Sequence, residues 1–143
     1  MYNTLLQIHS GIRYLVLLGL VVVIVKSFMG LINKSNYDKS DDRLSLFLFI
    51  STHTQLLFGL LLYFVSPFVT FGSTTMSDKI TRYWTVEHLT GMLLAVALIT
   101  IARISSKKMV DDTAKHKRMF IFNALALVII VVIIVISDRQ LVG

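Results

Sequence analysis

Two histidines stand at corresponding positions in apolar stretches of the sequence and could together bind a metal ion. His9 lies in LLQIHSGIRYLVLL and His88 in YWTVEHLTGMLLAV, each about four residues inside an apolar run. At a helical rise of about 1.5 Å per residue, both lie roughly 6 Å below the same boundary of a bilayer. Polar groups within a membrane are costly, so a matched pair indicates a function. Two imidazoles that converge across a helix bundle can hold a haem iron through its axial positions.

Charged and small residues accompany the two histidines. Arg13 falls one turn after the first histidine, where we expect its guanidinium to meet a haem propionate or Glu87, the only glutamate in the chain. Arg82 is a second candidate for the propionates. Gly91 begins a stripe of small residues on the side of the second histidine. Such a stripe either lets a partner helix approach closely or leaves room for a flat macrocycle.

These residues require a membrane-spanning scaffold, and the composition provides one. Of the 143 residues, 55% are hydrophobic and 15% are charged, a balance typical of a membrane protein and not of a soluble domain. Four apolar runs are each close to the roughly 20 residues that cross a bilayer. We predict one all-α domain over residues 1–143, an integral membrane antiparallel four-helix bundle with short connections. Its helices are expected at about 5–25, 44–64, 84–104 and 119–136.

The cationic residues predict the orientation of this bundle. Ten of the fourteen Lys and Arg residues flank the segments 32–43 and 105–118. The positive-inside rule places these segments in the cytoplasm and both termini outside, as in a multi-pass protein of a bacterial inner membrane. The net charge of +6 therefore belongs to membrane flanks and does not predict nucleic-acid binding. The chain has no cysteine, so a metal or cofactor must be held by His, Met, Tyr or carboxylate side chains.

The remaining polar residues of the spans leave several possibilities open. Gln55 shares a helix face with a glycine and a tyrosine and is expected to point inward, whereas His53 lies roughly 200° around the helix from it. His53 is expected to bond to a neighbouring helix or to face a partner. A polar or proton relay through Glu87, His53 and Gln55 is a further possibility. His116, in KHKR, is expected to be solvated at the level of the lipid headgroups.

Three segments together resemble one four-helix half of the haem A synthase family, and also small bacterial four-helix proteins of the cytochrome b type. The segments are IHSGIRYLVLLGLVVVIV, HTQLLFGLLLYF and EHLTGMLLAVALI. The resemblance implies one b-type haem held between His9 and His88 near the outer face. The family's catalytic helix has a glutamate three residues before its histidine and an arginine directly after it, where this chain has Leu6 and Ser10. The resemblance therefore implies haem binding and not haem hydroxylation.

The sequence thus predicts a bis-histidine haem b protein that transfers electrons as a subunit of a larger respiratory or redox assembly. A quinone or a redox protein at the outer face and other membrane subunits are the expected partners, besides the lipid bilayer. The alternative is a cofactor-free accessory subunit of a respiratory or transport complex. In that case Glu87 and Arg13 would form a buried ion pair that fixes the helix register, since each charge alone would be too costly.

Overall fold

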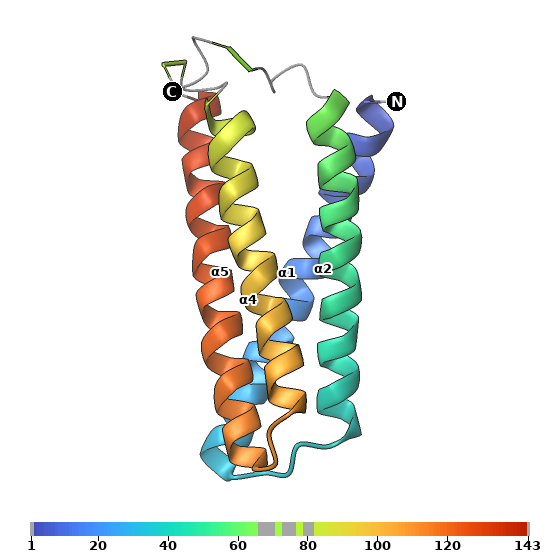
Figure 1. Cartoon of the computed structure of the whole chain (residues 1–143), viewed down its shortest axis with the longest axis vertical. Helices are drawn as coiled ribbons and strands as arrows, with labels where there is room; N and C mark the ends of the chain where they lie inside the picture. The colour runs from blue at the N-terminus through green and yellow to red at the C-terminus, as the bar shows by residue number, and fades with distance from the viewer. Residues whose placement is uncertain (1, 66–70, 73–76, 79–81, 143) are drawn as a thin grey trace.

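The computed structural model describes residues 2–65, 71–72, 77–78 and 82–142, and these residues form four long helices (Figure 1). They are α1 (Tyr2–Asn33), α2 (Lys39–Val65), α4 (His88–Lys107) and α5 (Asp112–Val142). A π-helical turn, η1 (Tyr83–Glu87), leads directly into α4. The prediction of an all-α antiparallel four-helix bundle is confirmed.

At the end of the bundle that carries the segments 34–38 and 108–111, each helix extends beyond its apolar run, so these connections are shorter than the sequence predicts. The segment between α1 and α2 is 34–38 instead of 32–43, and the segment between α4 and α5 is 108–111 instead of 105–118. Hydropathy marks the part of a helix that lies in lipid, whereas the helix continues through polar residues until a cap ends it.

The caps at the first connection are visible in the backbone and side chains. Lys34 has φ of 53°, and the N–H of Ser35 donates to the carbonyl of Gly30 at 3.0 Å, which is the Schellman pattern that ends a helix. The Asp38 carboxylate then accepts the backbone N–H of Ser40 at 3.0 Å and of Asp41 at 3.2 Å, and so caps the start of α2. These two caps limit the connection to five residues.

The helices form a ring in which α1 and α4 stand diagonally opposite each other. α1 packs against both α2 and α5, α4 packs along α5, and α2 and α4 form the least extensive contact between neighbours in the ring. Figure 1 shows this wide spacing between α2 and α4 in the upper part of the bundle. The core consists mainly of branched aliphatic and alanine side chains: Val16, Leu20, Leu48, Ala95, Ile99, Ala126 and Ile130.

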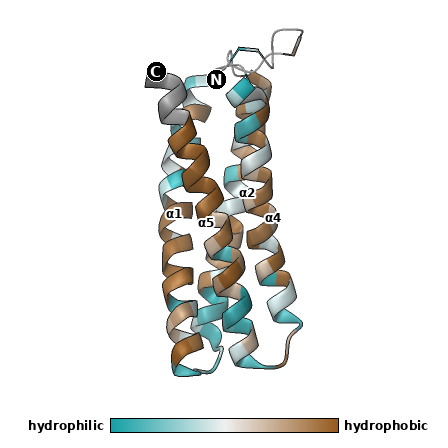
Figure 2. Ribbon diagram, turned by 90° about the vertical axis from the view of Figure 1, so that its left-hand side faces the viewer, coloured by the Kyte–Doolittle hydropathy of each residue, from teal (hydrophilic) through white to brown (hydrophobic). Residues whose placement is uncertain are grey.

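The two ends of the bundle differ in composition. The terminal end is the end at which α1 begins and α2 ends, and both chain termini lie there (Figure 1). The loop end carries segments 34–38 and 108–111, and Figure 2 shows hydrophilic residues gathered there, with hydrophobic residues over most of the helix lengths. Of the four Lys and Arg residues outside the ten counted above, Lys79 and the side chain of Arg139 lie outside the described residues. The orientation in the membrane stays a prediction.

Four of the described helical segments are long and apolar enough to cross a membrane: Tyr2–Asn33, Lys39–Val65, His88–Lys107 and Asp112–Ile136. Their outward faces carry large exposed apolar side chains, such as Leu18, Leu57 and Val128. Such a surface is stable in contact with lipid tails, because apolar side chains are costly to expose to water but not to hydrocarbon. The chain therefore has the architecture of a multi-pass membrane protein.

Candidate functional site

The π-helical turn at the start of α4 positions His88. The N–H of His88 donates to the carbonyl of Tyr83, which closes the wide turn. Tyr83 is buried, and its hydroxyl donates to the carbonyl of Ile133 on α5 at 3.0 Å. The Tyr83 and His88 rings lie with their centroids 5.7 Å apart. A π turn inside a helix changes the direction of the residues that follow, and such turns are frequent at functional sites.

α2 positions His9 from the other side of the bundle. The Gln55 amide nitrogen donates to the backbone carbonyl of His9 at 2.9 Å and lies 3.5 Å from the His9 Nε2 atom. Gly59, one turn further along α2, lies beside the His9 ring, since a Cβ atom at Gly59 would come within 3.1 Å of His9 Cε1. The inward direction predicted for Gln55 is therefore confirmed.

The two histidine rings face each other between the diagonal helices. Their centroids are 6.4 Å apart and their planes are inclined by 61°. The depth match predicted from the sequence is confirmed, because rings at different levels of the bundle could not approach so closely. The pair lies near the terminal end, seven residues after the start of α1 and at the first residue of α4.

A cavity of about 450 Å³ surrounds the histidine pair, and side chains of all four helices line it. Its volume is within the range of about 300–1,000 Å³ that is usual for small-molecule and cofactor sites. Most of its wall is apolar, with Leu56 and Leu60 from α2 and Met92 and Val96 from α4 among the lining residues. The cavity can therefore hold a mainly apolar group.

Three polar atoms that belong to this wall are buried and have no hydrogen-bond partner within the described chain: His9 Nδ1, Thr52 Oγ1 and Gln55 Oε1. Buried polar atoms are rarely left in this state, because each costs about 1–3 kcal/mol when it lacks a partner. Their concentration at one cavity indicates that a bound group or water completes their hydrogen bonding.

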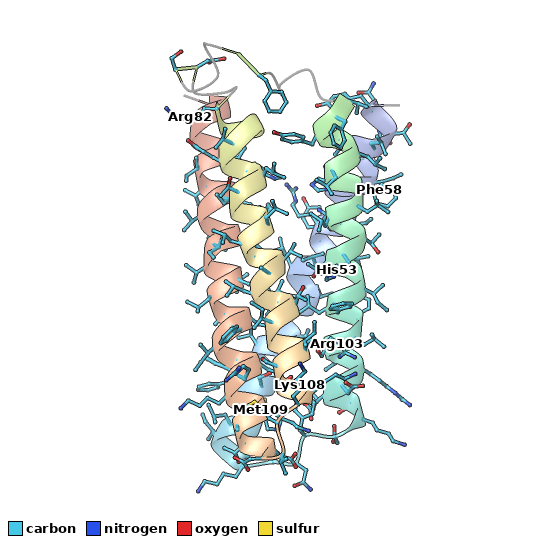
Figure 3. The ribbon with its side chains drawn as sticks, in the orientation of Figure 1. His53, Phe58, Arg82, Arg103, Lys108 and Met109 are labelled. Carbon is cyan, nitrogen blue, oxygen red and sulfur yellow. The ribbon has the colours of Figure 1, made fainter. Side chains whose placement is uncertain are left out.

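The charged residues predicted for the site take different positions. Arg13 lines the cavity, and its guanidinium donates to the Tyr14 hydroxyl at 3.2 Å. Arg82 and Glu87 instead form an ion pair across the π turn, with 2.8 Å between Nε and Oε1. The alternative pairing of Glu87 with Arg13 is therefore wrong; the π turn brings the carboxylate back to the residue five positions earlier. Figure 3 shows Arg82 at the terminal end of the bundle, and it directly precedes η1.

Gly91 does not line the cavity. A Cβ atom at this position would lie 2.5 Å from two side-chain atoms of Ile133, so Gly91 serves the close approach of α4 to α5. The sequence predicted either a close helix approach or room for a macrocycle, and the structure gives the former. Ala95, in the same stripe, is buried and does line the cavity.

The proposed polar relay is not assembled in the structure. The His53 Nδ1 atom lies 2.9 Å from the carbonyl of Phe49, one turn earlier in α2, and the two rings are 4.2 Å apart. This contact is within α2 and not with another helix, so the prediction of an inter-helix bond is wrong. Figure 3 shows His53 midway along α2. His53 does not line the cavity, whereas Gln55 does, and Glu87 is paired outside it.

A second group of polar residues lies at the loop end, and there His116 departs from its predicted position. His116 is 1% exposed, although the sequence predicts a solvated side chain. Its Nε2 atom lies 3.1 Å from the carbonyl of Ser35, and its ring centroid is 5.2 Å from that of Tyr37. α5 begins at Asp112, a full turn before His116, so this side chain is already inside the bundle. Gly30 of α1 provides the space.

The sequence pattern missed two contributors to these sites. Tyr83 looks like an interfacial aromatic residue, and only the π turn reveals that it is buried beside His88. Arg103 is 8% exposed and donates to the Ser45 hydroxyl at 3.0 Å and to the Asp42 carboxylate at 3.3 Å. Figure 3 shows Arg103 at the loop end of α4, far along the bundle from Arg82. The sequence feature that could have predicted this role is the position of Arg103 in an apolar run, opposite acidic residues.

The fold and site define a multi-pass membrane protein of the four-helix class, with a histidine pair in an internal cavity. Comparison of the chain with protein-family models, with curated proteins and with solved structures gave no match. Within the described residues, no group of three or more His, Cys, Asp or Glu side chains is placed to hold a metal ion. The resemblance to haem A synthase thus stays a prediction.

Proposed function

We propose that the chain binds one b-type haem in the cavity, with His9 and His88 as axial ligands, and that it transfers electrons. The observation that carries this proposal is the pair of histidine rings, 6.4 Å apart, that face each other from diagonal helices across a cavity of about 450 Å³. Bundle cores of this kind are where facing helices hold cofactors.

The separation of the rings fits a single metal ion between them. A metal–nitrogen bond is about 2.0–2.1 Å, and in a five-membered ring with bonds of about 1.33 Å the centre lies about 1.1 Å from each nitrogen. Two imidazoles on opposite sides of one ion therefore have centroids about 6.3 Å apart when the bonding is linear. A zinc or copper ion alone fits less well, since two nitrogens leave its coordination shell incomplete.

The other cavity residues support the binding of a largely apolar macrocycle with an acidic edge. Leu56, Leu60 and Met92 give the cavity an apolar wall on the side of α2 and α4. Arg13 contributes a positive charge where the propionates of the macrocycle would require one. A bound haem would supply one-electron oxidation and reduction.

The position of the histidine pair near the terminal end suggests which side exchanges electrons. With the positive-inside orientation, the terminal end faces the outside of a bacterial inner membrane. We propose that a quinone dissolved in the bilayer or a redox protein at the outer face exchanges electrons with this site. A single site near one face does not span the bilayer, so the chain would act as a subunit of a larger respiratory assembly.

A reduced-minus-oxidised visible spectrum of the purified chain, reconstituted with haem, tests the proposal. We expect the spectrum of a six-coordinate b-type haem, with one haem bound per chain. His9→Ala and His88→Ala should each abolish that spectrum, whereas His53→Ala, a matched histidine outside the cavity, should retain it. Absence of haem from the fully reconstituted wild-type chain would refute haem binding. A normal spectrum in the His88→Ala protein would show that the ligands are wrongly assigned.

The accessory-subunit alternative gives the opposite result in the same experiment. It predicts no bound haem and a bundle whose stability is unchanged by addition of haem. The ion pair of Arg82 with Glu87 favours this alternative only weakly, because both side chains are about 30% exposed (31% and 29%) and such pairs contribute little.

A further inference from the structure

Gln55 connects α2 to the histidine of α1 through two of its contacts. Its amide nitrogen donates to the His9 carbonyl at 2.9 Å and lies 3.5 Å from His9 Nε2. The first contact is a hydrogen bond of normal length, whereas the second is at the limit for one. The amide group is therefore anchored on the α1 backbone, and its contact with the ring is weak enough to be exchanged.

The atoms that these two side chains leave without a partner are complementary. His9 Nδ1 and Gln55 Oε1 are both buried, and neither has a hydrogen-bond partner among the described residues. A neutral imidazole has one N–H donor, and an amide oxygen is an acceptor only. The two unpaired atoms therefore belong to neighbouring side chains on facing helices, and one hydrogen bond between them would satisfy both.

We propose that Gln55 is a positioning residue for His9: its carbonyl oxygen accepts the Nδ1–H of His9 when the Nε2 atom binds the metal. This inference rests on the proposed haem site. The ring gives up its weak contact with the Gln55 amide nitrogen, while the anchor on the His9 carbonyl remains. Gly59 also lies against the His9 ring and restricts its movement. A Cβ atom added to this glycine would be only 3.1 Å from His9 Cε1.

The chemistry of metal-bound histidine requires such a partner. A ligating imidazole usually donates its second N–H to a carbonyl or carboxylate, which fixes the tautomer and raises the basicity of the metal-bound nitrogen. Greater basicity favours the oxidised iron and so lowers the reduction potential. Gln55 is the side chain in hydrogen-bonding contact with His9, and its oxygen is the acceptor that remains available.

Three variants test this role in the haem-loaded full chain. Gln55→Leu removes the acceptor at nearly constant volume, so the reduction potential should rise and haem affinity should fall by about 10–100-fold. Gln55→Glu supplies a stronger acceptor, so the reduction potential should fall below that of the wild type, even though a carboxylate cannot donate to the His9 carbonyl as the amide does. Gln7→Leu makes the same change on an exposed residue of α1 outside the cavity and should alter neither quantity.

The opposite signs of the two potential shifts distinguish positioning from a merely structural role. If Gln55→Leu does not fold, Gln55→Met provides a second apolar variant with the same expected rise. Shifts in the same direction for the Leu and Glu variants, or shifts no larger than that of Gln7→Leu, would overturn the role of Gln55 and leave haem binding by His9 and His88 intact. Failure of the wild-type chain to bind haem would instead overturn the proposed function itself.

Discussion

Replacement of Gly30 by alanine should destabilise the bundle, although alanine is the better helix former. Gly30 lies in the last turn of α1, directly against the ring of His116 on α5. A Cβ atom at Gly30 would lie 2.5–2.6 Å from three ring atoms of His116, far inside van der Waals contact. The ring cannot easily move, because Ser35 and Tyr37 contact it and the side chain is 1% exposed.

The expected magnitude follows from two opposing effects. Alanine instead of glycine in a helix interior gains about 0.5–1 kcal/mol. Overpacking of a well-filled site costs about 1–3 kcal/mol, and displacement of the His116 ring would also lose its hydrogen bond to Ser35, worth about 0.5–1.5 kcal/mol. The steric cost exceeds the gain in helix propensity, so Gly30→Ala should lower the free energy of unfolding by about 1–3 kcal/mol.

Equilibrium unfolding in detergent micelles measures this difference, and the chain contains a matched control. Gly11 lies on the same helix, and a Cβ atom there would meet nothing within 4 Å. Gly11→Ala should therefore stabilise the protein slightly, by about 0.5–1 kcal/mol. In a Gly30→Ala/His116→Ala double variant the steric cost should disappear. Equal stabilisation by the Gly11 and Gly30 substitutions would refute the packing of His116 against α1.

Two further predictions concern the connection between α1 and α2. Lys34 has φ of 53°, which is unfavourable for a residue with a Cβ atom, so Lys34→Gly should stabilise the protein by about 1 kcal/mol in the same unfolding assay. The Ser40 hydroxyl, followed by the Asp41 backbone N–H, lowers the pKa of the Asp38 carboxyl from 3.8 to about 2. Because the folded-state pKa is the lower one, this carboxylate stabilises the fold above pH 4, and the contribution is lost as the pH falls through about 2. Asp38→Asn keeps a capping side chain that does not titrate, so the difference in stability between wild type and variant should change over this pH range and stay constant from pH 5 to 7.

The sequence predicted the architecture well because bilayer thickness limits the possible solutions. Four apolar runs of about 20 residues leave little choice but four spanning helices. Hydropathy carries no information on where a helix stops in water. The connection between the caps at Lys34 and Asp38 is therefore shorter than the predicted one. The same limitation explains His116: hydropathy placed it in a connection, but α5 begins four residues earlier, at Asp112.

The site was predictable to the level of helix and depth, but not to the level of side-chain partners. Equal spacing from an apolar boundary is enough to bring His9 and His88 to one level. The partner of Glu87 depends on the local helix type. In a regular α-helix, residues three and four apart are neighbours. The π turn instead brings together residues five apart, so Arg82 becomes the partner. No residue pattern in the sequence predicts that π turn.

The two polar regions of the bundle differ in how completely their hydrogen bonds are satisfied. At the loop end, Arg103 has the oxygen atoms of Asp42 and Ser45 as partners, and the Asp41 carboxylate lies 2.9 Å from Lys26. These contacts hold the helices together, and His116 Nδ1 is the one atom of the described residues named in this region that is buried without a partner. At the terminal end, three buried atoms without partners all belong to residues that line one cavity.

The other two buried side-chain atoms without partners, His116 Nδ1 and Asn123 Oδ1, belong to described residues that do not line the cavity. A chain that leaves polar atoms unsatisfied in lipid loses stability for each one. The coincidence of the three terminal-end atoms, His9 Nδ1, Thr52 Oγ1 and Gln55 Oε1, with a cavity and a histidine pair is the strongest reason to expect that the terminal end binds a group that this chain does not itself supply.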